Sequence, residues 1–189
     1  MTAVYIIIAI VVLVLLFIVV TYNGLVRLRN QMKNAWAQID VQLKRRHNLI
    51  PNLVNTVKGY AAHERQTLEA VTNARNVAQG AVGKGVGVQS KAEGVLSEAL
   101  SRLLVVVESY PDLKASQNFL ALQEELTSTE NKIAFSRQFY NDSVLGYNNK
   151  THMFPSNIIA GMFAFKEGEF FELEAPAERE VPQVSFGLS

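Results

Sequence analysis

Three histidines and one glycine-rich stretch containing a lysine are the residues of this 189-residue chain best suited to chemistry. The stretch GAVGKGVG, residues 80–87, resembles a phosphate-binding loop at first sight. Such a loop needs four residues between its first glycine and the Gly-Lys pair, then Ser or Thr, and a preceding strand. Here two residues separate Gly80 from Gly83, Gly85 follows Lys84, and helical patterns lie on both sides. We interpret the stretch as an interhelical loop rather than a nucleotide site.

The histidines do not predict a metal site or a catalytic site. His47, His63 and His152 are scattered, and His63-Glu64 lacks the second histidine four residues after the first that a zinc-binding helix requires. Cysteine is absent, so there is no thiolate site and no disulfide. No Ser/His/Asp set or carboxylate pair stands out. The sequence therefore predicts no enzymatic activity, no cofactor and no metal.

The charges are unevenly distributed although the net charge is only +1. Residues 22–50 carry six Lys or Arg against one acid, residues 51–165 carry ten of each sign, and residues 166–189 carry six Glu against two bases. This order gives a basic neck, a neutral middle and an acidic end. The small net charge does not point to a nucleic-acid partner.

Residues 3–20 form an uninterrupted apolar run of 18 residues. As a helix this run spans roughly 27 Å, close to the bilayer core of about 30 Å. A cleaved signal peptide would have a basic segment before a shorter run and small residues at its end, and this run has neither. We therefore predict an uncleaved transmembrane anchor with membrane lipids as partners, and the residues expected to span the bilayer include Ala3, Ile7, Val11, Leu15 and Val19.

Arg27, Arg29 and Lys33 follow the run, and no basic side chain precedes it. The positive-inside rule then predicts a single-pass protein of the inner (cell) membrane, with its N-terminus outside and its C-terminal domain in the cytoplasm. Arg27 and Arg29 are close enough to the anchor to contact lipid headgroups.

The rest of the chain follows helical periodicity. Apolar residues from Leu25 to Leu43 form one stripe, and this first helix is expected to end near Arg46 because Pro51 disfavours helix at the preceding residue. Further helices are expected over about 51–79, 90–109 and 113–149, with a short helix over 157–163 capped by Ser156. The predicted fold class is all-α: a transmembrane helix continuing into an antiparallel helical bundle with long helices, plus an extended C-terminal tail. The predicted segments are an anchor (1–21), a bundle (22–149) and a short helix with an acidic tail (150–189).

Two sets of residues are candidate docking or oligomer contacts. The cluster Lys44, Arg45 and Arg46 would lie roughly 35 Å beyond the anchor, far outside the screening length of about 8 Å, so it is expected to pair with acids or simply to be solvated. Phe170, Phe171 and Phe186 in the tail are expected to anchor it to its own bundle or to a neighbour. The apolar stripe of the first helix fits either lateral packing of copies or the core of the bundle.

Several blocks of the sequence resemble the LemA family of bacterial membrane proteins: YNGLVRLRN (22–30), AWAQIDVQLKRRHNLIPNLVNTVKGYAAHE (35–64), LTSTENKIAFSRQFYNDSVLGYNN (126–149) and FFELEAP with EVPQVSF (170–186). The resemblance implies a single-pass protein with a helical bundle on a long first helix and no established enzymatic activity. One branch of the family is linked to magnetosome membrane formation.

Two functions remain open from the sequence. The first is a non-enzymatic scaffold that forms a homo-oligomer and helps to organise or shape the bacterial membrane. The second is a membrane-tethered adaptor or regulator that binds a partner protein through its bundle or its tail.

Overall fold

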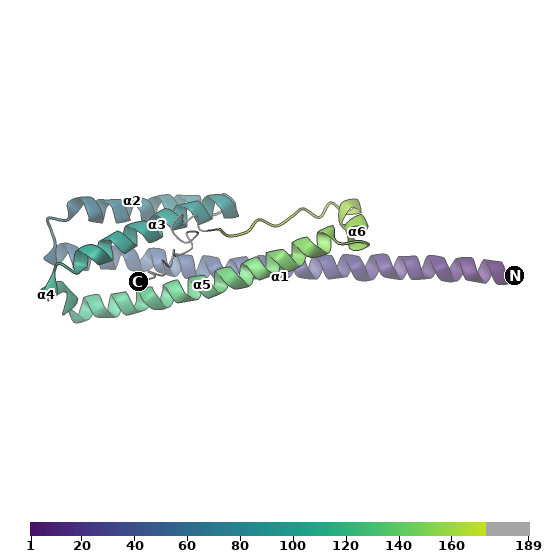
Figure 1. Cartoon of the computed structure of the whole chain (residues 1–189), viewed down its shortest axis with the longest axis horizontal. Helices are drawn as coiled ribbons and strands as arrows, with labels where there is room; N and C mark the ends of the chain where they lie inside the picture. Colours follow the sequence, from purple (N-terminus) through teal and green to yellow (C-terminus); the bar gives the residue numbers. More distant parts are fainter. Residues whose placement is uncertain (173–189) are drawn as a thin grey trace, which may run out of the picture. The chain divides into compact units, whose positions relative to one another are not determined.

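The computed structural model describes residues 1–172, and over this range it contains helices and no strand (Figure 1). The predicted all-α class is confirmed. The helices are α1 (Thr2–Tyr60), α2 (Arg65–Ala81), α3 (Val86–Val107), α4 (Pro111–Lys114), α5 (Gln117–His152) and α6 (Ser156–Met162).

The prediction that the first helix ends near Arg46 is wrong, because α1 continues through Pro51 to Tyr60. Proline in a helix interior lacks the N–H for the bond to the carbonyl four residues earlier and costs about 3 kcal/mol. Ile50, Leu53 and Val57 on both sides of the proline are buried. Burying a large aliphatic side chain contributes about 1.5–3 kcal/mol, so three such side chains outweigh the local cost.

The chain divides into two compact units. Unit 1 contains residues 1–48 and 124–170, and unit 2 contains residues 49–123 together with the described residues Phe171 and Glu172. In unit 1, the pairs Arg45–Glu125, Arg46–Glu130 and Trp36–Tyr140 join α1 to α5 in opposite chain order, so the two helices are antiparallel. The stripe that begins at Leu25 is core: its residues Leu25, Ile39 and Leu43 are buried in unit 1 together with the neighbouring Ala35 and with Leu126, Ile133, Tyr140 and Val144 of α5.

In unit 2, α2 and α3 pack against each other as a helical hairpin. The reversal between them contains Gly83 and Gly85, both with positive φ, which glycine adopts without steric cost. The buried side chains include Leu68, Val71, Ala74 and Ala78 from α2 and Leu96, Leu100 and Leu103 from α3. The Tyr110 hydroxyl donates a hydrogen bond of 3.0 Å to Glu64.

Near the end of α5 the structure corrects one further expectation. Ser156 does not cap the short helix but lies within α6, and Pro155 precedes it as the first flanking residue. The Ser156 hydroxyl lies 2.7 Å from the Lys150 carbonyl and 2.8 Å from the Met153 carbonyl. It therefore bonds the Lys150 carbonyl in the last turn of α5 and the Met153 carbonyl just after it, the second of which also accepts from the Asn157 N–H at 2.9 Å.

Candidate functional site

The first third of α1 is apolar and exposed. Within the described chain, α1 is the helix long and apolar enough to cross a membrane, and of residues 3–20 all but Ile18 are exposed. A soluble domain would not expose such a continuous apolar surface. The segment is therefore a candidate membrane anchor, as the sequence predicted, and the protein is membrane-associated.

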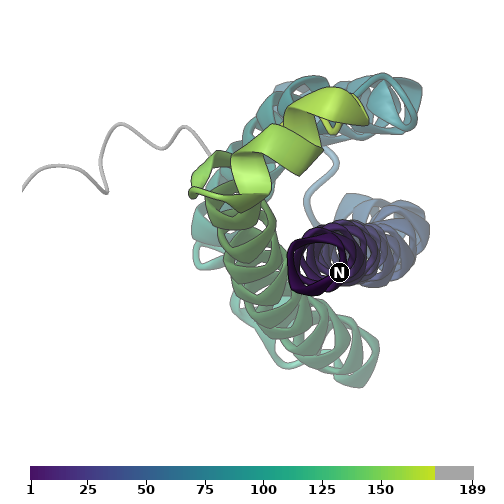
Figure 2. The ribbon, with the colours of Figure 1, turned by 90° about the vertical axis from the view of Figure 1, so that its right-hand side faces the viewer.

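Where the anchor ends, α6 packs on α1. Ile159 and Ala160 of α6 form a buried cluster with Leu25, and Ile18 and Tyr22 pack against it. We call this region, together with residues 163–170 and the end of α5, the junction. Figure 2 shows α6 running across the direction of α1 rather than along it.

The chain turns sharply as it leaves α6. The Phe165 N–H donates to the Ala160 carbonyl and the Ala164 N–H donates to the Gly161 carbonyl, which is the hydrogen-bond pattern of a Schellman motif. Ala164 occupies the left-handed position of that motif, with φ of 53°, where glycine is usual. The motif places Phe165 back against the cluster of Leu25, Ile159 and Ala160.

Aromatic contacts fill the junction beside α1. The ring of Tyr22 lies 4.8 Å from that of Phe163 and 5.7 Å from that of Phe165. The Arg29 guanidinium lies 5.1 Å from the centre of the Phe165 ring, within the range of a cation–π interaction. The structure therefore gives Arg29 a protein contact, whereas Arg27 is exposed.

Residues 166–169 are bound to α5 by a series of hydrogen bonds. Tyr147 donates to the Lys166 carbonyl at 2.8 Å and Tyr140 donates to the Glu169 carbonyl at 2.7 Å. The Asn148 amide makes two bonds to Gly168, donating to its carbonyl at 3.0 Å and accepting from its N–H at 2.8 Å.

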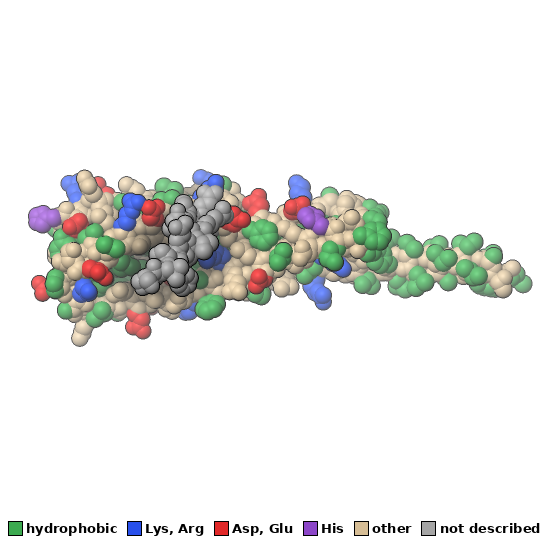
Figure 3. Space-filling view, in the orientation of Figure 1, with side chains coloured by type: hydrophobic (Ala, Val, Ile, Leu, Met, Phe, Trp, Pro, Cys, Tyr) green, Lys and Arg blue, Asp and Glu red, His purple; other side chains and the backbone are tan. Residues whose placement is uncertain are grey.

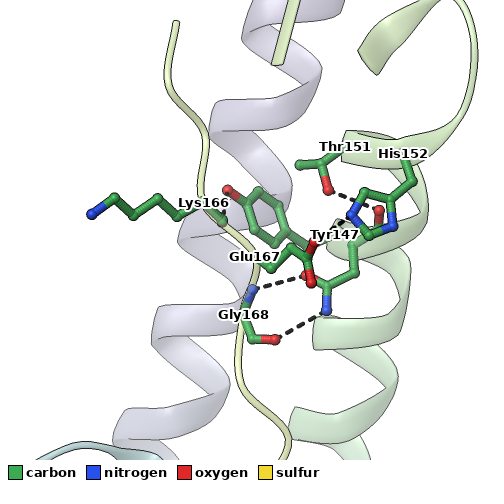
Figure 4. A network of polar contacts seen from close by, with 7 residues as sticks. Tyr147, Thr151, His152, Lys166, Glu167 and Gly168 are labelled. Atoms are coloured by element: carbon green, nitrogen blue, oxygen red, sulfur yellow. Dashed lines mark hydrogen bonds and ion pairs between the residues drawn. The ribbon is translucent and has the colours of Figure 1, made fainter. Parts of the chain in front are cut away.

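Figure 4 shows the part of this network around Tyr147 and Gly168, with the Lys166 side chain extending away from it. His152 and Glu167 are 2.7 Å apart there and both are exposed. An extended segment without a neighbouring strand lacks backbone partners for its N–H and carbonyl groups. Here two tyrosine hydroxyls and one side-chain amide bond to them instead.

Burial governs the titration of both tyrosines. Burial, followed by the charge of Glu169, raises the pKa of Tyr140 to about 12. Burial also raises the pKa of Tyr147, although the nearby Arg29 partly opposes it. Both hydroxyls therefore remain protonated donors at physiological pH. The sequence analysis missed this network, because hydrogen bonds between a helix and an irregular segment follow no periodic pattern.

The basic cluster at 44–46 divides into different environments. Lys44 is exposed, Arg45 forms a 3.2 Å pair with Glu125, and Arg46 is 2% exposed and forms a 2.7 Å pair with Glu130. The acids of both pairs belong to α5.

The tail phenylalanines also differ. Phe170 is exposed, whereas Phe171 is 1% exposed within the chain. Phe186 lies outside the described residues. Docking to another protein through any of these residues stays a prediction.

The described residues contain no group of three His, Cys, Asp or Glu placed to hold a metal ion. His47 is buried in α1, His63 is exposed before α2, and His152 is beside Glu167. The three histidines are thus not brought together. What the junction offers chemically is apolar and aromatic surface at the end of a membrane anchor.

Comparison with known proteins gives consistent matches. Two magnetosome proteins from Paramagnetospirillum magneticum, MamQ 1 and MamQ 2, are 28% identical over 180 residues, covering 82% of this chain and 66% of each relative. Protein LemA of Metamycoplasma hominis is 30% identical over 139 residues, covering 73% of this chain and 63% of the relative. The chain thus spans just under two thirds of the length of these relatives. The model of the LemA family matches residues 35–186, which is most of the chain, and the chain therefore belongs to the LemA family.

Proposed function

We propose that this protein is a non-enzymatic scaffold that is anchored by α1, associates with copies of itself and helps to organise the membrane in which it lies. Its relatives named MamQ are magnetosome proteins, which supports a role at a membrane. The apolar stripe of α1 is used inside unit 1, so contact between copies requires a different surface.

The observation that carries the proposal is a polar face of α1 just beyond the anchor. A shallow groove of about 600 Å³ runs along this face beside Phe139 of α5. Its lining residues recur at three- and four-residue steps, so they share one side of the helix: Asn23, Val26, Arg27, Asn30, Gln31, Asn34 and Gln38.

Side-chain amides suit contact between identical surfaces. Each Asn or Gln both donates and accepts hydrogen bonds, so an amide face is complementary to a second copy of itself. A two-fold interface requires this property, because the same patch is present on both subunits. Phe139 on α5, which lines the groove, is an exposed large apolar side chain and adds surface for the contact.

The test is the mass of full-length protein in mild detergent, measured by light scattering on a sizing column. We expect a particle of several subunits for the natural chain. The double variant Asn30→Glu with Asn34→Glu should reduce that mass, because it places like charges opposite each other across the interface.

A matched control changes two exposed amides on the same helix outside the groove, Asn52→Glu with Asn55→Glu, and should leave the mass unchanged. A monomeric natural chain would refute self-association, and a stoichiometric protein purified with it would favour the adaptor function.

The proposed orientation places the N-terminus outside and α5 in the cytoplasm. The chain contains no cysteine, so one introduced cysteine is a unique label. In intact cells, a membrane-impermeant maleimide should modify Thr2→Cys and should spare Val41→Cys, which is exposed on α1. The reverse pattern would contradict the orientation.

A further inference from the structure

The segment around α6 lacks charge to an unusual degree. Residues 153–165, between His152 and Lys166, contain no charged side chain. This is the longest uncharged stretch outside the N-terminal apolar segment. A helix on the surface of a globular protein normally carries charged and polar side chains on its exposed face. This observation raises the question of what covers the outer face of α6.

The two faces of α6 have different surroundings. The inner face, with Ser156, Ile159 and Ala160, is buried. Ile158 and Met162 lie about one turn apart on α6 and are 54% and 67% exposed, and Phe154 just before the helix is 79% exposed. Met153 and Phe163 are also exposed large apolar side chains next to them. The described part of unit 1 therefore leaves an apolar face of α6 uncovered.

The position of α6 along α1 indicates which part of the membrane this exposed face contacts. Ile18, which packs against the α6 cluster, belongs to the apolar run that ends at Val20. Leu25, at the centre of that cluster, lies five residues beyond Val20, or about 7.5 Å along the helix. The lipid headgroup layer adds about 5–8 Å to each side of the hydrocarbon core. α6 therefore lies at the level where hydrocarbon gives way to headgroups.

The direction of α6 and the surrounding side chains fit that level. Because α6 runs across α1, an anchor that crosses the bilayer holds α6 close to the membrane plane (Figure 2). Figure 3 shows apolar side chains gathered next to the place where the bare part of α1 emerges. Tyr22, whose ring packs on Phe163, is a residue type enriched at membrane interfaces.

Basic side chains flank the apolar face. Lys150 precedes it, Lys166 follows it, and Arg27 on α1 is exposed just beyond the anchor. Cations at this depth are attracted to anionic lipid headgroups. The arrangement has the features of an interfacial helix, with apolar residues entering the acyl boundary and bases at its edge.

We propose that the outer face of α6, with Ile158 and Met162, inserts together with Phe154 just before the helix into the bilayer at the boundary between headgroups and acyl chains. The protein then contacts the membrane twice, through the anchor and through a short helix that lies in one leaflet beside it. A helix inserted in one leaflet expands that leaflet relative to the other. This inference requires α1 to be anchored, but it does not depend on self-association.

Site-directed spin labelling of the full-length chain in phosphatidylcholine and phosphatidylglycerol vesicles tests the insertion. Single-cysteine variants Phe154→Cys, Ile158→Cys and Met162→Cys carry the nitroxide, and collision rates with oxygen and with a water-soluble nickel chelate report its depth. Phe135→Cys is the matched control, because Phe135 is 74% exposed on α5, 19 residues before Phe154. Leu15→Cys in the anchor is the lipid standard.

We expect the oxygen-to-nickel ratio at residues 154, 158 and 162 to resemble that at residue 15 and to exceed that at residue 135 several-fold. A ratio equal to that at residue 135 would overturn the proposal and leave this face in water. Labels shielded from both reagents would also overturn it, because protein, from this chain or another, would then cover the face. These ratios are independent of particle mass, so the insertion and the self-association can fail separately.

Discussion

Arg46 and Arg45 are neighbours in sequence with different energetic roles. Arg46 is 2% exposed and bonded to Glu130, whereas Arg45 and Glu125 are both about half exposed. Removing one member of a buried pair costs about 3–5 kcal/mol, which we reduce to about 2–3 kcal/mol because Glu130 retains contact with water. Arg45→Ala should cost less than about 1 kcal/mol. Thermal unfolding followed by circular dichroism measures both, and equal losses would contradict the assignment.

Tyr140 makes the stability of unit 1 depend on alkaline pH. Burial raises its pKa from the ordinary value of 10.0 to about 12, so between those values the folded chain keeps a proton that the unfolded chain has lost. The stabilisation is complete below pH 10 and declines by up to about 1.4 kcal/mol per pH unit as the pH rises toward 12. Tyr140→Phe should show a shallower decline over this range. An identical pH dependence in both proteins would exclude Tyr140 as its source.

At the scale of elements, residues 166–169 are confined by both long helices. Gly168 is bonded to Asn148 of α5, and a Cβ added at Gly168 would lie 2.5 Å from the Met32 sulfur on α1. We expect Gly168→Ala to destabilise by about 1 kcal/mol at most, because the obstructing sulfur is near the end of the flexible Met32 side chain and can shift. The loss should be smaller when it is measured in a Met32→Ala background, because the obstructing sulfur is gone.

Gly146→Ala on α5 is the control for this prediction. A Cβ there meets nothing within 4 Å, and alanine in a helix interior is favoured over glycine by about 0.5–1 kcal/mol. Chemical unfolding of the four variants provides the comparison. A Gly168→Ala cost that persists undiminished without Met32 would show that the glycine is required for another reason.

The helical periodicity of apolar residues correctly predicted regular helices. The prediction failed where tertiary packing overrides a local rule. The stripe from Leu25 to Leu43 correctly indicated a helix, because its burial repeats every three or four residues. The break expected at Pro51 did not occur, because the burial of Ile50, Leu53 and Val57 is not visible to a rule based on neighbouring residues. The sequence predicts the short helix near 157–163 but not the exposed apolar surface around it, because Phe154 precedes the helix and only Ile158 and Met162 lie within it.

At the scale of the whole molecule, we expect attachment to the membrane to depend on the candidate anchor in α1, and we expect α6 to determine how the chain meets the surface. Fifteen of residues 3–20 are Leu, Ile, Val or Phe. At about 0.4 kcal/mol each, these side chains favour insertion by about 6 kcal/mol, and one arginine near the centre opposes it by about 3 kcal/mol. A single Val11→Arg chain should therefore remain inserted. The double variant Val11→Arg with Leu15→Arg should be close to balance and largely extracted from membranes by alkaline carbonate.

The α6 face cannot compensate for that loss. It supplies five large apolar side chains. Even a whole inserted acyl chain gives only marginal, reversible membrane binding, so these side chains cannot replace the anchor. The matched control, Gln66→Arg with Asn73→Arg on the exposed side of α2, adds the same charge and should stay in the membrane fraction. If the double anchor variant resisted carbonate as the natural chain does, the attachment would lie outside residues 3–20. If the double anchor variant is released and the control is retained, the free energy of anchoring comes from α1. The contribution of α6 is then to the depth of the chain in the membrane and to the local packing of lipid.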